Sequence, residues 1–519
     1  MGLALGILMT VFLLGLILVK GVDVFWPHKV AELTLADGQK IAGIKTIERE
    51  AGQDDDRHQE AQYFVGNRKS NGFSFKFLRL DEITSTAYPK DIVVAERMEY
   101  GDAIFYPLSL TLADGSTIDS DFSTSLRKLV DVAADRRDEI KSLERDEIGA
   151  LNRKIAAANL EIRSIQRSNP GDTSTVSALE AEIKTYDAEY QTLADKAAKL
   201  RQSQGLNKLT YRLPSGEEIT APVGDIVAFH FPNRLSTGAK ISLFCSNLWH
   251  FIADDPREAN TEGGIFPAIF GTFVMTLLMS IAVTPFGVVA AIYLREYAKQ
   301  GVIVQAVRIS VNNLAGVPSI VFGVFGLGFF IYILGDWVDL AFFPDAAAEN
   351  QPVFKTGGIL WASLTLAIMT LPVIIVATEE ALAAVPRGVR EAALACGASR
   401  WQTIQRIVLP SATPGILTGV ILAMARGAGE VAPLMLVGVI KVVETLPVDA
   451  VFPFIHPERK FMHLGFHIYD LGFQSPDSEA AKPMVFATTF LLILLVVVMN
   501  LAAILLRNHL RKKYAMASF

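Results

Sequence analysis

The sequence predicts an all-α polytopic membrane protein with an inserted α+β domain, and three observations support this fold class. Hydrophobic residues make up 51% of the 519 residues and charged residues only 20%, which is unusual for a soluble domain. Six apolar stretches approach the roughly 20 residues that a helix needs to cross a bilayer. A largely polar segment, 23–262, separates the first stretch from the other five.

Each apolar stretch is bounded by charges or turn residues, as expected of a membrane span. The first lies in residues 1–22 and is predicted to be an anchor, because it lacks the basic start and the small-residue cleavage site of a signal peptide. The other five lie in residues 263–519. The six predicted spans are 2–19, 266–294, 304–334, 357–378, 415–440 and 483–506.

Positive charge predicts the orientation of the spans. The basic cluster 507–513 follows the last span, and short basic segments remain on the cytoplasmic side. Six crossings then place both termini in the cytoplasm and residues 23–262 outside the cell membrane. Cys245 and Cys396 fall on opposite sides, so we expect no disulfide between them.

The inserted segment begins and ends with strand patterns. Apolar residues alternate around a glycine-containing turn in three places, and dipeptides such as Asp37-Gly38 permit tight hairpins. We expect three related β-hairpins that share one small sheet, at 31–44, 108–121 and 208–221.

A charged, alanine-rich stretch, 125–203, lies between the second and third hairpins and is interrupted only at Asn169-Pro170-Gly171. Apolar residues recur at spacings of three and four in both arms, which predicts an antiparallel coiled-coil hairpin. An arm of about 30 residues would reach roughly 45 Å. A packed coiled coil with solvated outer faces is the simpler interpretation, and a docking arm for a partner is the alternative.

The segment 379–410 predicts a helix, a tight turn and a second helix. The small residues Ala392, Ala393 and Gly397 keep this turn thin and would let a partner's backbone approach closely. An amphipathic helix that rests on lipid headgroups is the alternative.

The residue spacing in this segment resembles the EAA loop of ATP-binding-cassette (ABC) importer permeases. In that family the loop forms a coupling helix that sits in a groove of the cytoplasmic ATPase and transmits its closure to the spans. The resemblance implies that the coupling residues are Glu391, Ala392, Ala393, Gly397, Leu409 and Pro410.

Other segments resemble the phosphate-specific branch of this family, among them NNLAGVPSIVFGVFG from Asn312 and ARGAGEVAPL from Ala425. The resemblance implies the ABC importer permease fold, phosphate as substrate and a bacterial inner membrane. The partners that it implies are a homologous second permease subunit, two cytoplasmic ABC ATPase subunits, a soluble phosphate-binding protein and membrane lipid.

Ionisable residues inside spans are candidates for the substrate pathway, because each costs about 2.5 to 3.5 kcal/mol on insertion scales. Arg426 and Glu430 lie four residues apart, which predicts one helical face. A guanidinium stays charged and can bind an oxyanion through two hydrogen bonds, and Glu430 would hold it while the pathway is empty. An ion pair that only locks two spans together is the alternative.

Three further residues are weaker pathway candidates. Arg308 could instead extend to the headgroups, and Asn312 and Ser319 could instead satisfy the backbone around Pro318. We interpret His250, His456, His463 and His467 as ordinary loop histidines without a ligand role.

Several functions are disfavoured. The sequence contains no GxxxxGK[ST] phosphate-binding loop, so ATP would be hydrolysed by partner subunits and the chain itself is not an enzyme. We expect no bound cofactor and no metal site. A net charge of −6 disfavours nucleic-acid binding.

The function predicted in this way is that of a permease subunit in an ATP-driven phosphate importer. A permease for another oxyanion, such as sulfate or molybdate, is one alternative. The other is a mechanotransmission or sensory membrane protein that uses the coiled-coil arm.

Overall fold

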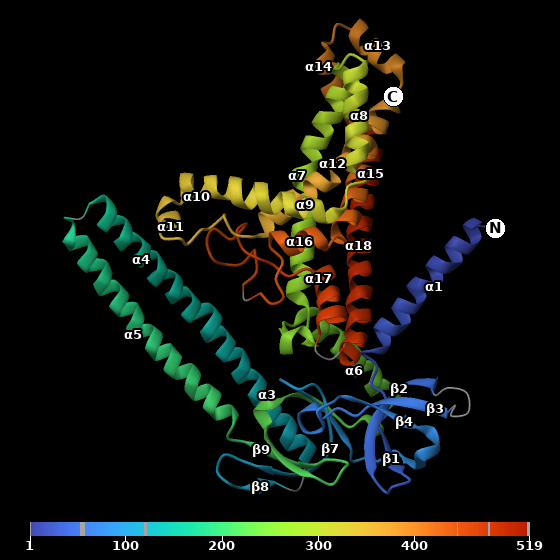
Figure 1. Cartoon of the computed structure of the whole chain (residues 1–519), viewed down its shortest axis with the longest axis vertical. Coiled ribbons are helices and arrows are strands. Elements are labelled where there is room, and N and C mark those ends of the chain that lie inside the picture. Colours follow the sequence, from blue (N-terminus) through green and yellow to red (C-terminus); the bar gives the residue numbers. More distant parts are fainter. Residues whose placement is uncertain are drawn as a thin grey trace. The chain divides into compact units, whose positions relative to one another are not determined.

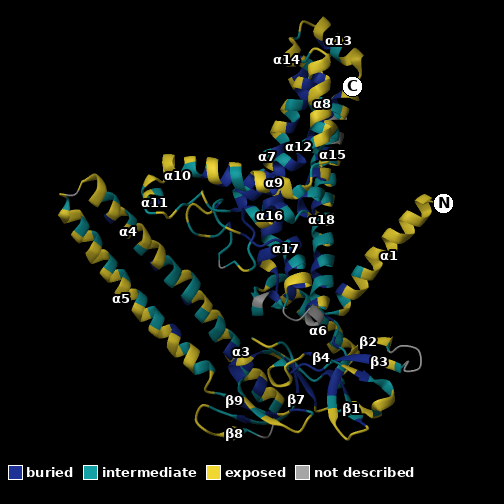
Figure 2. Ribbon diagram, in the orientation of Figure 1, coloured by how far each residue is buried: buried dark blue, intermediate teal, exposed yellow. Residues whose placement is uncertain are grey.

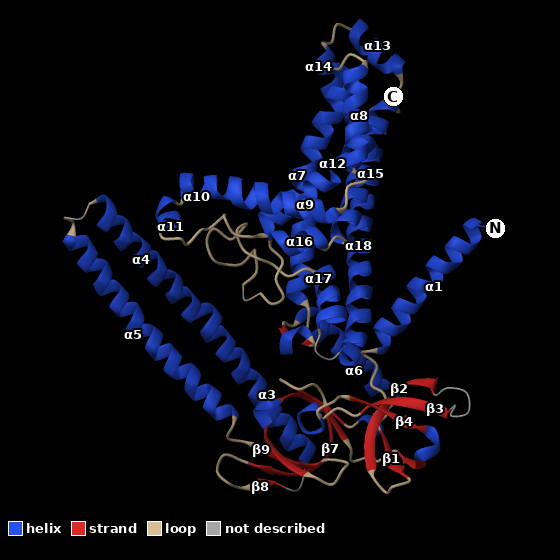
Figure 3. Ribbon diagram, in the orientation of Figure 1, coloured by secondary structure: helices blue, strands red, loops and turns tan. Residues whose placement is uncertain are grey.

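A computed structural model of the chain describes residues 2–51, 58–118, 122–169, 171–443, 445–475 and 478–515. The chain divides into two compact units (Figure 1). The membrane unit consists of Met1–Val22 and Ile265–Phe519, and the inserted domain is Asp23–Gly264. Figure 3 shows that the long helices dominate the first unit and that the sheets belong to the second.

The described part of the membrane unit contains six helices that are long and apolar enough to cross a bilayer, as predicted. They are Gly2–Asp23, Phe266–Tyr297, Ser319–Phe342, Ile359–Ala383, Arg400–Ala428 and Ala481–Leu510. Their elements are α1 (Gly2–Asp23), α7 (Phe266–Ile292) with η7 (Tyr293–Tyr297), α9 (Ser319–Phe325) with η8 (Gly326–Gly335) and α10 (Asp336–Phe342), α12 (Ile359–Ala383), α14 (Arg400–Thr403) with η9 (Ile404–Val408) and α15 (Leu409–Ala428), and α18 (Ser478–Ala515).

Two predicted spans have wrong boundaries. The predicted span 304–334 is interrupted at Pro318, so α8 (Val302–Leu314) is a separate short helix and the span begins at Ser319. Proline has no N–H to donate, and it disfavours helical backbone in the residue before it. The predicted span 415–440 ends at Ala428, because Gly429 caps α15 and Pro433 lies in the first turn of the next helix, α16 (Ala432–Val437).

Helix α12 lies at the centre of the membrane unit and packs against α7 and α15. The core that these helices share consists of fully buried apolar side chains, including Met275 and Met279 of α7, Leu366 and Met369 of α12, and Ala423 of α15. Small residues allow the helices to approach closely, as expected inside a bilayer. By contrast, α1 is exposed along nearly its whole length (Figure 2).

The described part of the inserted domain contains two main antiparallel sheets, so the expectation of one shared sheet was wrong. The first has the order β4-β3-β2-β1-β5, and the second has the order β10-β9-β7-β6-β11 with β8 beside β7. A third, two-stranded sheet pairs β12 with β13. The strands are β1 (Ala31–Leu35), β2 (Lys40–Ala51), β3 (His58–Phe64), β4 (Phe75–Arg79), β5 (Ile83–Ala87), β6 (Val93–Arg97), β7 (Ala103–Thr111), β8 (Thr117–Ile118), β9 (Lys208–Arg212), β10 (Glu218–Pro222), β11 (Ile226–His230), β12 (Pro256–Arg257) and β13 (Glu262–Gly263).

Each main sheet has its own core, which is why the hairpins separate. Hairpin β1–β2 packs through Leu33 against Tyr63 of its own sheet. Hairpins β7–β8 and β9–β10 share a second core that contains Phe105 and Tyr211. Residues 119–121, the end of the second predicted hairpin, lie outside the described residues.

The stretch between β8 and β9 is a helical hairpin. One arm consists of α3 (Phe122–Ser142), η3 (Leu143–Ile148) and α4 (Gly149–Ser168), and the other is α5 (Thr173–Gln204). The tip residue Pro170 lies outside the described residues. Leu126 and Val130 of α3 are buried in the core of the second sheet, and they attach the base of the helical hairpin to that sheet.

The arms are antiparallel. Lys196 lies 2.8 Å from Glu139 near the root, and farther along Lys154 lies over the Tyr186 ring at 5.3 Å. The predicted apolar positions of α5 are less exposed than their neighbours, and Ala197 is buried. The coiled-coil supercoil itself stays a prediction.

Two acidic side chains of the inserted domain lie close together, one just before β7 and one in β13. Burial raises the pKa of Asp102 to about 7, and repulsion from the Glu96 carboxylate adds to the rise. Burial raises the pKa of Glu262 to about 8, with repulsion from Asp102 and Glu96 as further causes. Arg257, which pairs with Glu96, offsets part of this repulsion.

These shifts predict that the inserted domain loses stability as the pH rises. Both carboxyls bind a proton more tightly in the folded domain than in the unfolded chain, so stability decreases with pH up to about 8. His230, whose pKa burial lowers to about 4, opposes this trend only below about pH 6.5, where the unfolded histidine is charged. We expect the unfolding midpoint to fall by about a few degrees between about pH 6.5 and about pH 8.5.

The substitution Glu262→Gln should flatten this dependence, because it removes one of the two carboxyls. Differential scanning calorimetry of the purified chain measures it. Glu189→Gln, on an exposed position of α5, is the matched control and should leave the dependence unchanged. A pH dependence as steep in Glu262→Gln as in the parent chain would contradict the assignment.

Candidate functional site

The predicted coupling loop lies at one end of the helices of the membrane unit, where Figure 1 shows α13 (Arg387–Ala395) beside α14. Gly397 ends α13 with a φ of 85°, a left-handed conformation that glycine adopts without strain. The next helix starts with a capping box between Ser399 and Gln402. The structure therefore contains the expected helix, tight turn and second helix.

The predicted coupling residues divide into exposed and packed groups. Glu391, Ala392 and Gly397 are exposed, whereas Ala393 is buried and cannot meet a partner directly, contrary to our expectation. A Cβ atom at Gly397 would meet nothing within 4 Å inside the chain, so the glycine serves the turn and leaves open space around it.

Leu409 and Pro410 belong to a different part of the site. They begin α15, and Leu409 packs on an apolar cluster that joins the ends of α7 and α12 to η9. The buried members of this cluster are Ile292, Leu382, Val385, Ile404, Val408, Ala412 and Ile416. This cluster anchors the loop on the spans.

Two exposed apolar residues of the loop were missed in the sequence analysis. Leu394 is 48% exposed and Trp401 is 54% exposed, and both lie close in sequence to Gly397. The sequence did offer a signal for them, because both are large apolar side chains in a segment that was expected to face water.

Arg390 connects the loop to the spans and was also missed. Its guanidinium donates to the backbone oxygens of Leu382 at 2.6 Å and Val385 at 2.7 Å, at the end of α12. It also donates to the Glu296 carboxylate in η7 at 3.0 Å, and both side chains are largely buried. One side chain of α13 therefore holds the ends of two spans.

Arg308 makes a second connection of this kind. It donates to Glu379 of α12 at 3.2 Å, to Gln300 at 2.9 Å and to the backbone oxygen of Leu294 at 3.4 Å. Asn312, one turn along α8, lines the same cavity of about 200 Å³ as Arg308. Ser319 begins α9 and does not line that cavity.

Arg426 and Glu430 form an ion pair, but not on one helical face as predicted. Helix α15 ends at Ala428, so Glu430 lies beyond it, with 3.7 Å between the Arg426 Nε and a Glu430 carboxylate oxygen. The Arg426 side chain donates no hydrogen bond among the residues that the structure describes, and it is about one-third exposed, at 34%. Neither residue lines the cavity beside Arg308.

Three of the histidines interpreted as ordinary loop residues are buried. His463 caps α17 (Leu464–Tyr469) by accepting from the Gly465 N–H at 3.1 Å, and His467 lies one turn later. His456 is buried beside Asp449. His250 is exposed and pairs with Asp254 at 3.0 Å. Within the described ranges, no group of three or more His, Cys, Asp or Glu side chains could hold a metal ion.

The chain resembles known membrane transport proteins. Residues 283–515 match the family of binding-protein-dependent transport system inner membrane components. The chain is 30% identical over 272 residues to a probable ABC transporter permease protein, YqgI, of Bacillus subtilis, covering 51% of this chain and 85% of that protein.

It is also 41% identical over 177 residues to the phosphate transport system permease protein PstA of Mycobacterium leprae, covering 34% of this chain. The chain spans 52% of the length of that relative. Among solved structures it is similar to an inward-facing MetNI methionine ABC transporter, with 20% identity, a TM-score of 0.33, and coverage of 47% of this chain and 94% of that chain. From the matched family and the extended similarity to YqgI, the chain belongs to the binding-protein-dependent transport system inner membrane components, which are multi-pass permease subunits of ABC importers.

Proposed function

We propose that the chain is the permease subunit of an ATP-driven phosphate importer and forms half of the translocation pathway. Similarity to PstA proteins over the permease part supports phosphate as the substrate. The observation that carries the proposal is Arg426, a charged side chain in the membrane unit that donates no hydrogen bond to the described part of the chain.

An unsatisfied guanidinium inside a membrane protein is costly, which favours a functional role over a structural lock. At 3.7 Å, the Arg426–Glu430 contact is longer than a hydrogen bond, so the guanidinium donors remain available. Phosphate would accept from them in a bidentate manner, and Glu430 would balance the charge when the pathway is empty.

The break after α15 helps to expose this group. Figure 1 shows α16, which follows the break, between the two ends of the helical bundle. Backbone that leaves the helix at this depth is expected only where it lines a cavity or is covered by protein. In the proposed complex, a homologous second permease subunit would cover the other side of the pathway.

Arg308, Asn312 and Ser319 are secondary pathway candidates in this proposal. Arg308 is already satisfied by Glu379 and Gln300, so it would guide phosphate only if that network opened. Asn312 has no side-chain partner among the described residues and could donate to phosphate from the same cavity. Ser319 would act farther along the route.

Coupling would begin at the exposed face of α13. A cytoplasmic ATPase subunit would grip Glu391, Ala392 and the open space at Gly397, while Ala393, Leu409 and Pro410 keep the loop packed on the spans. Arg390 would transmit the movement of α13 to α7 and α12.

Both termini would be cytoplasmic and residues 23–262 would lie outside. A soluble phosphate-binding protein would deliver the substrate on the outer side.

A first prediction concerns Arg426. Arg426→Gln should abolish phosphate uptake while the assembled complex remains intact, because the charge that attracts phosphate is lost and the side chain stays polar. Uptake of radiolabelled phosphate into proteoliposomes measures the effect. Arg295→Gln, at an exposed position, is the control and should transport normally.

Competition in the same assay identifies the oxyanion, because a guanidinium also binds sulfate and molybdate. Excess sulfate or molybdate should leave phosphate uptake unchanged. Uptake by Arg426→Gln at the parent rate would remove this residue from the pathway, and inhibition by either competitor would point to a different substrate.

A second prediction concerns Arg390. Arg390→Gln should reduce uptake by about tenfold or more, because charged hydrogen bonds are worth about 1.5–3 kcal/mol each. ATP hydrolysis by the complex should decrease much less, since the ATPase subunits remain bound. The ratio of phosphate transported to ATP hydrolysed measures this uncoupling.

The same Arg295→Gln chain is a matched control, since Arg295 is adjacent to Glu296 in the sequence and is exposed. Glu296→Gln should uncouple more weakly, because Arg390 keeps its bonds to the two backbone oxygens. An unchanged transport ratio in Arg390→Gln would show that this contact does not transmit movement.

A further inference from the structure

The inserted domain contains a pocket where three connections meet. The turn before β2, the connection 65–73 that includes α2 (Arg68–Asn71), and the turn after β9 surround a cavity of about 90 Å³. A cavity of about 10–15 Å³ holds one water molecule, so this one has room for a small solute.

The pocket is lined by apolar and polar residues. Its apolar members Ala42, Val65 and Leu213 are buried. Among the described residues, its lining includes two lysines, Lys40 and Lys76, and no aspartate or glutamate. Its charge therefore favours an anion.

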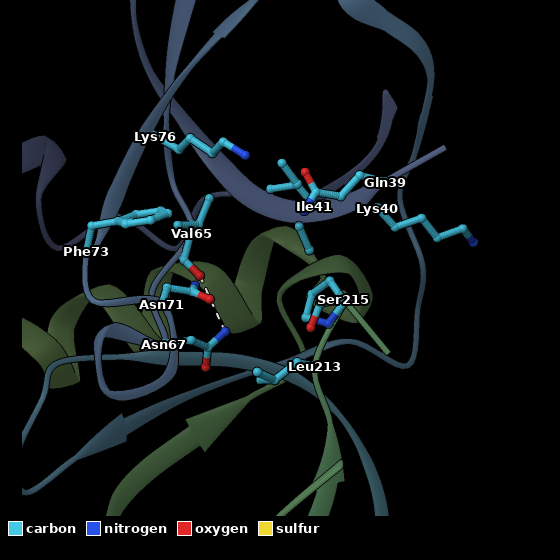
Figure 4. Close-up of a pocket in the computed structure, with 12 residues that line it drawn as sticks. Gln39, Lys40, Ile41, Val65, Asn67, Asn71, Phe73, Lys76, Leu213 and Ser215 are labelled. Atoms are coloured by element: carbon cyan, nitrogen blue, oxygen red, sulfur yellow. Dashed lines mark hydrogen bonds between the residues drawn. The ribbon is translucent and has the colours of Figure 1, made fainter. Parts of the chain in front are cut away.

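The two lysines differ in their partners. Lys40 pairs with Glu32 at 3.2 Å, and Figure 4 shows its side chain extending away from the other lining residues. Lys76 extends from β4 toward Gln39 and Ile41 in the same view. Lys76 forms no ion pair with any residue that the structure describes, so its charge is available to a ligand.

Other donors of the pocket are also available. The Gln39 side-chain amide and the Ser215 hydroxyl form no side-chain hydrogen bond within the described chain. Asn67 is different, because its amide nitrogen donates to the backbone oxygen of Ile104 at 2.7 Å and so holds the pocket wall. The Lys76 ammonium, the Gln39 amide and the Ser215 hydroxyl thus border the same cavity. None of these three groups donates a hydrogen bond to a described residue.

We propose that this pocket is a second anion site, which binds a small tetrahedral oxyanion such as inorganic phosphate or sulfate. Lys76 lies in β4 and Gln39 in the turn between β1 and β2 of the first sheet, and Ser215 lies in a turn of the second sheet. A bound oxyanion would therefore link the two sheets and stabilise the inserted domain. The site is independent of Arg426 and does not rest on the proposed transport function.

Equilibrium dialysis of the purified full chain in lipid nanodiscs against radiolabelled inorganic phosphate tests the proposal. The variants are Lys76→Gln, Arg426→Gln, and the conservative Lys76→Arg, with Lys184→Gln on an exposed position of α5 as the matched control. Lys76→Gln should weaken binding by about tenfold or more, because it removes a charged hydrogen bond. Lys76→Arg and Lys184→Gln should retain this binding, and Arg426→Gln should lose only the phosphate that its own guanidinium would hold.

Calorimetry of the same samples gives a second readout. Phosphate should raise the unfolding midpoint of the inserted domain in the parent chain and in Arg426→Gln, but not in Lys76→Gln. Unlabelled sulfate should displace the phosphate, because both ions are tetrahedral oxyanions, and failure to displace it would overturn this assignment of the ligand class.

Equal phosphate binding by Lys76→Gln and the parent chain would overturn the proposal, as would the absence of any phosphate binding. Binding that is lost only in Arg426→Gln would also overturn it, while supporting the pathway role of Arg426. The two proposals can therefore fail separately.

Discussion

The close packing of α12 against α7 and α15 is the constraint on which the rest of the membrane unit depends. A Cβ atom at Gly287 of α7 would lie 2.4 Å from Ile374 of α12, and one at Gly419 of α15 would lie 2.5 Å from Ala377 of α12. Because lipid offers no hydrophobic driving force between helices, this contact depends on van der Waals packing between small surfaces. It fixes where the end of α12 lies, and with it the acceptors that Arg390 and Arg308 use.

Three arginines of the membrane unit carry the same guanidinium group but differ in the partners around it. Arg390 and Arg308 each donate to a carboxylate and to backbone oxygens near the ends of spans, so they hold helices together. The Arg426 side chain lies 3.7 Å from the Glu430 carboxylate and donates no hydrogen bond within the described chain. A guanidinium with hydrogen-bond acceptors connects elements, and the lack of a side-chain hydrogen bond from Arg426 to the described residues is what supports its proposed pathway role.

In the inserted domain, too, charged side chains differ in whether they have a partner of opposite charge. Lys40 is paired with Glu32, but Lys76 faces a cavity whose described lining contains no carboxylate. Elsewhere in the domain, Asp102 and Glu262 lie close enough to repel each other, and Arg257 only partly offsets that repulsion. Each main sheet has a core of its own, and a further apolar cluster that includes Ala42 of β2 and Ile104 of β7 joins the two sheets.

Most local structure could be predicted because its causes are local. Apolar length and composition predicted the six span-forming helices, and the pattern around Gly397 predicted the loop that α13 and α14 form. The two errors in the span boundaries had visible causes in the sequence, since Pro318 and Pro433 cannot donate a backbone hydrogen bond.

The candidate site was only partly predictable. Sequence spacing identified Arg426 and Glu430 as a pair, but the end of α15 decided that they meet beyond the helix. Arg390 and Glu296 lie 94 residues apart, and Arg308 and Glu379 lie 71 residues apart, so no periodic pattern could join them.

By itself, the sequence determined which segments are helical and apolar enough to span a membrane, where the turns fall, and which charges are costly to bury, because these follow from composition and short-range geometry. Only the tertiary structure decided that the hairpins divide between two sheets, that His463 and His467 are buried, and which arginines find acceptors. The physical reason is that these outcomes depend on which distant surfaces pack together, and packing brings acceptors to some charges and leaves others without them.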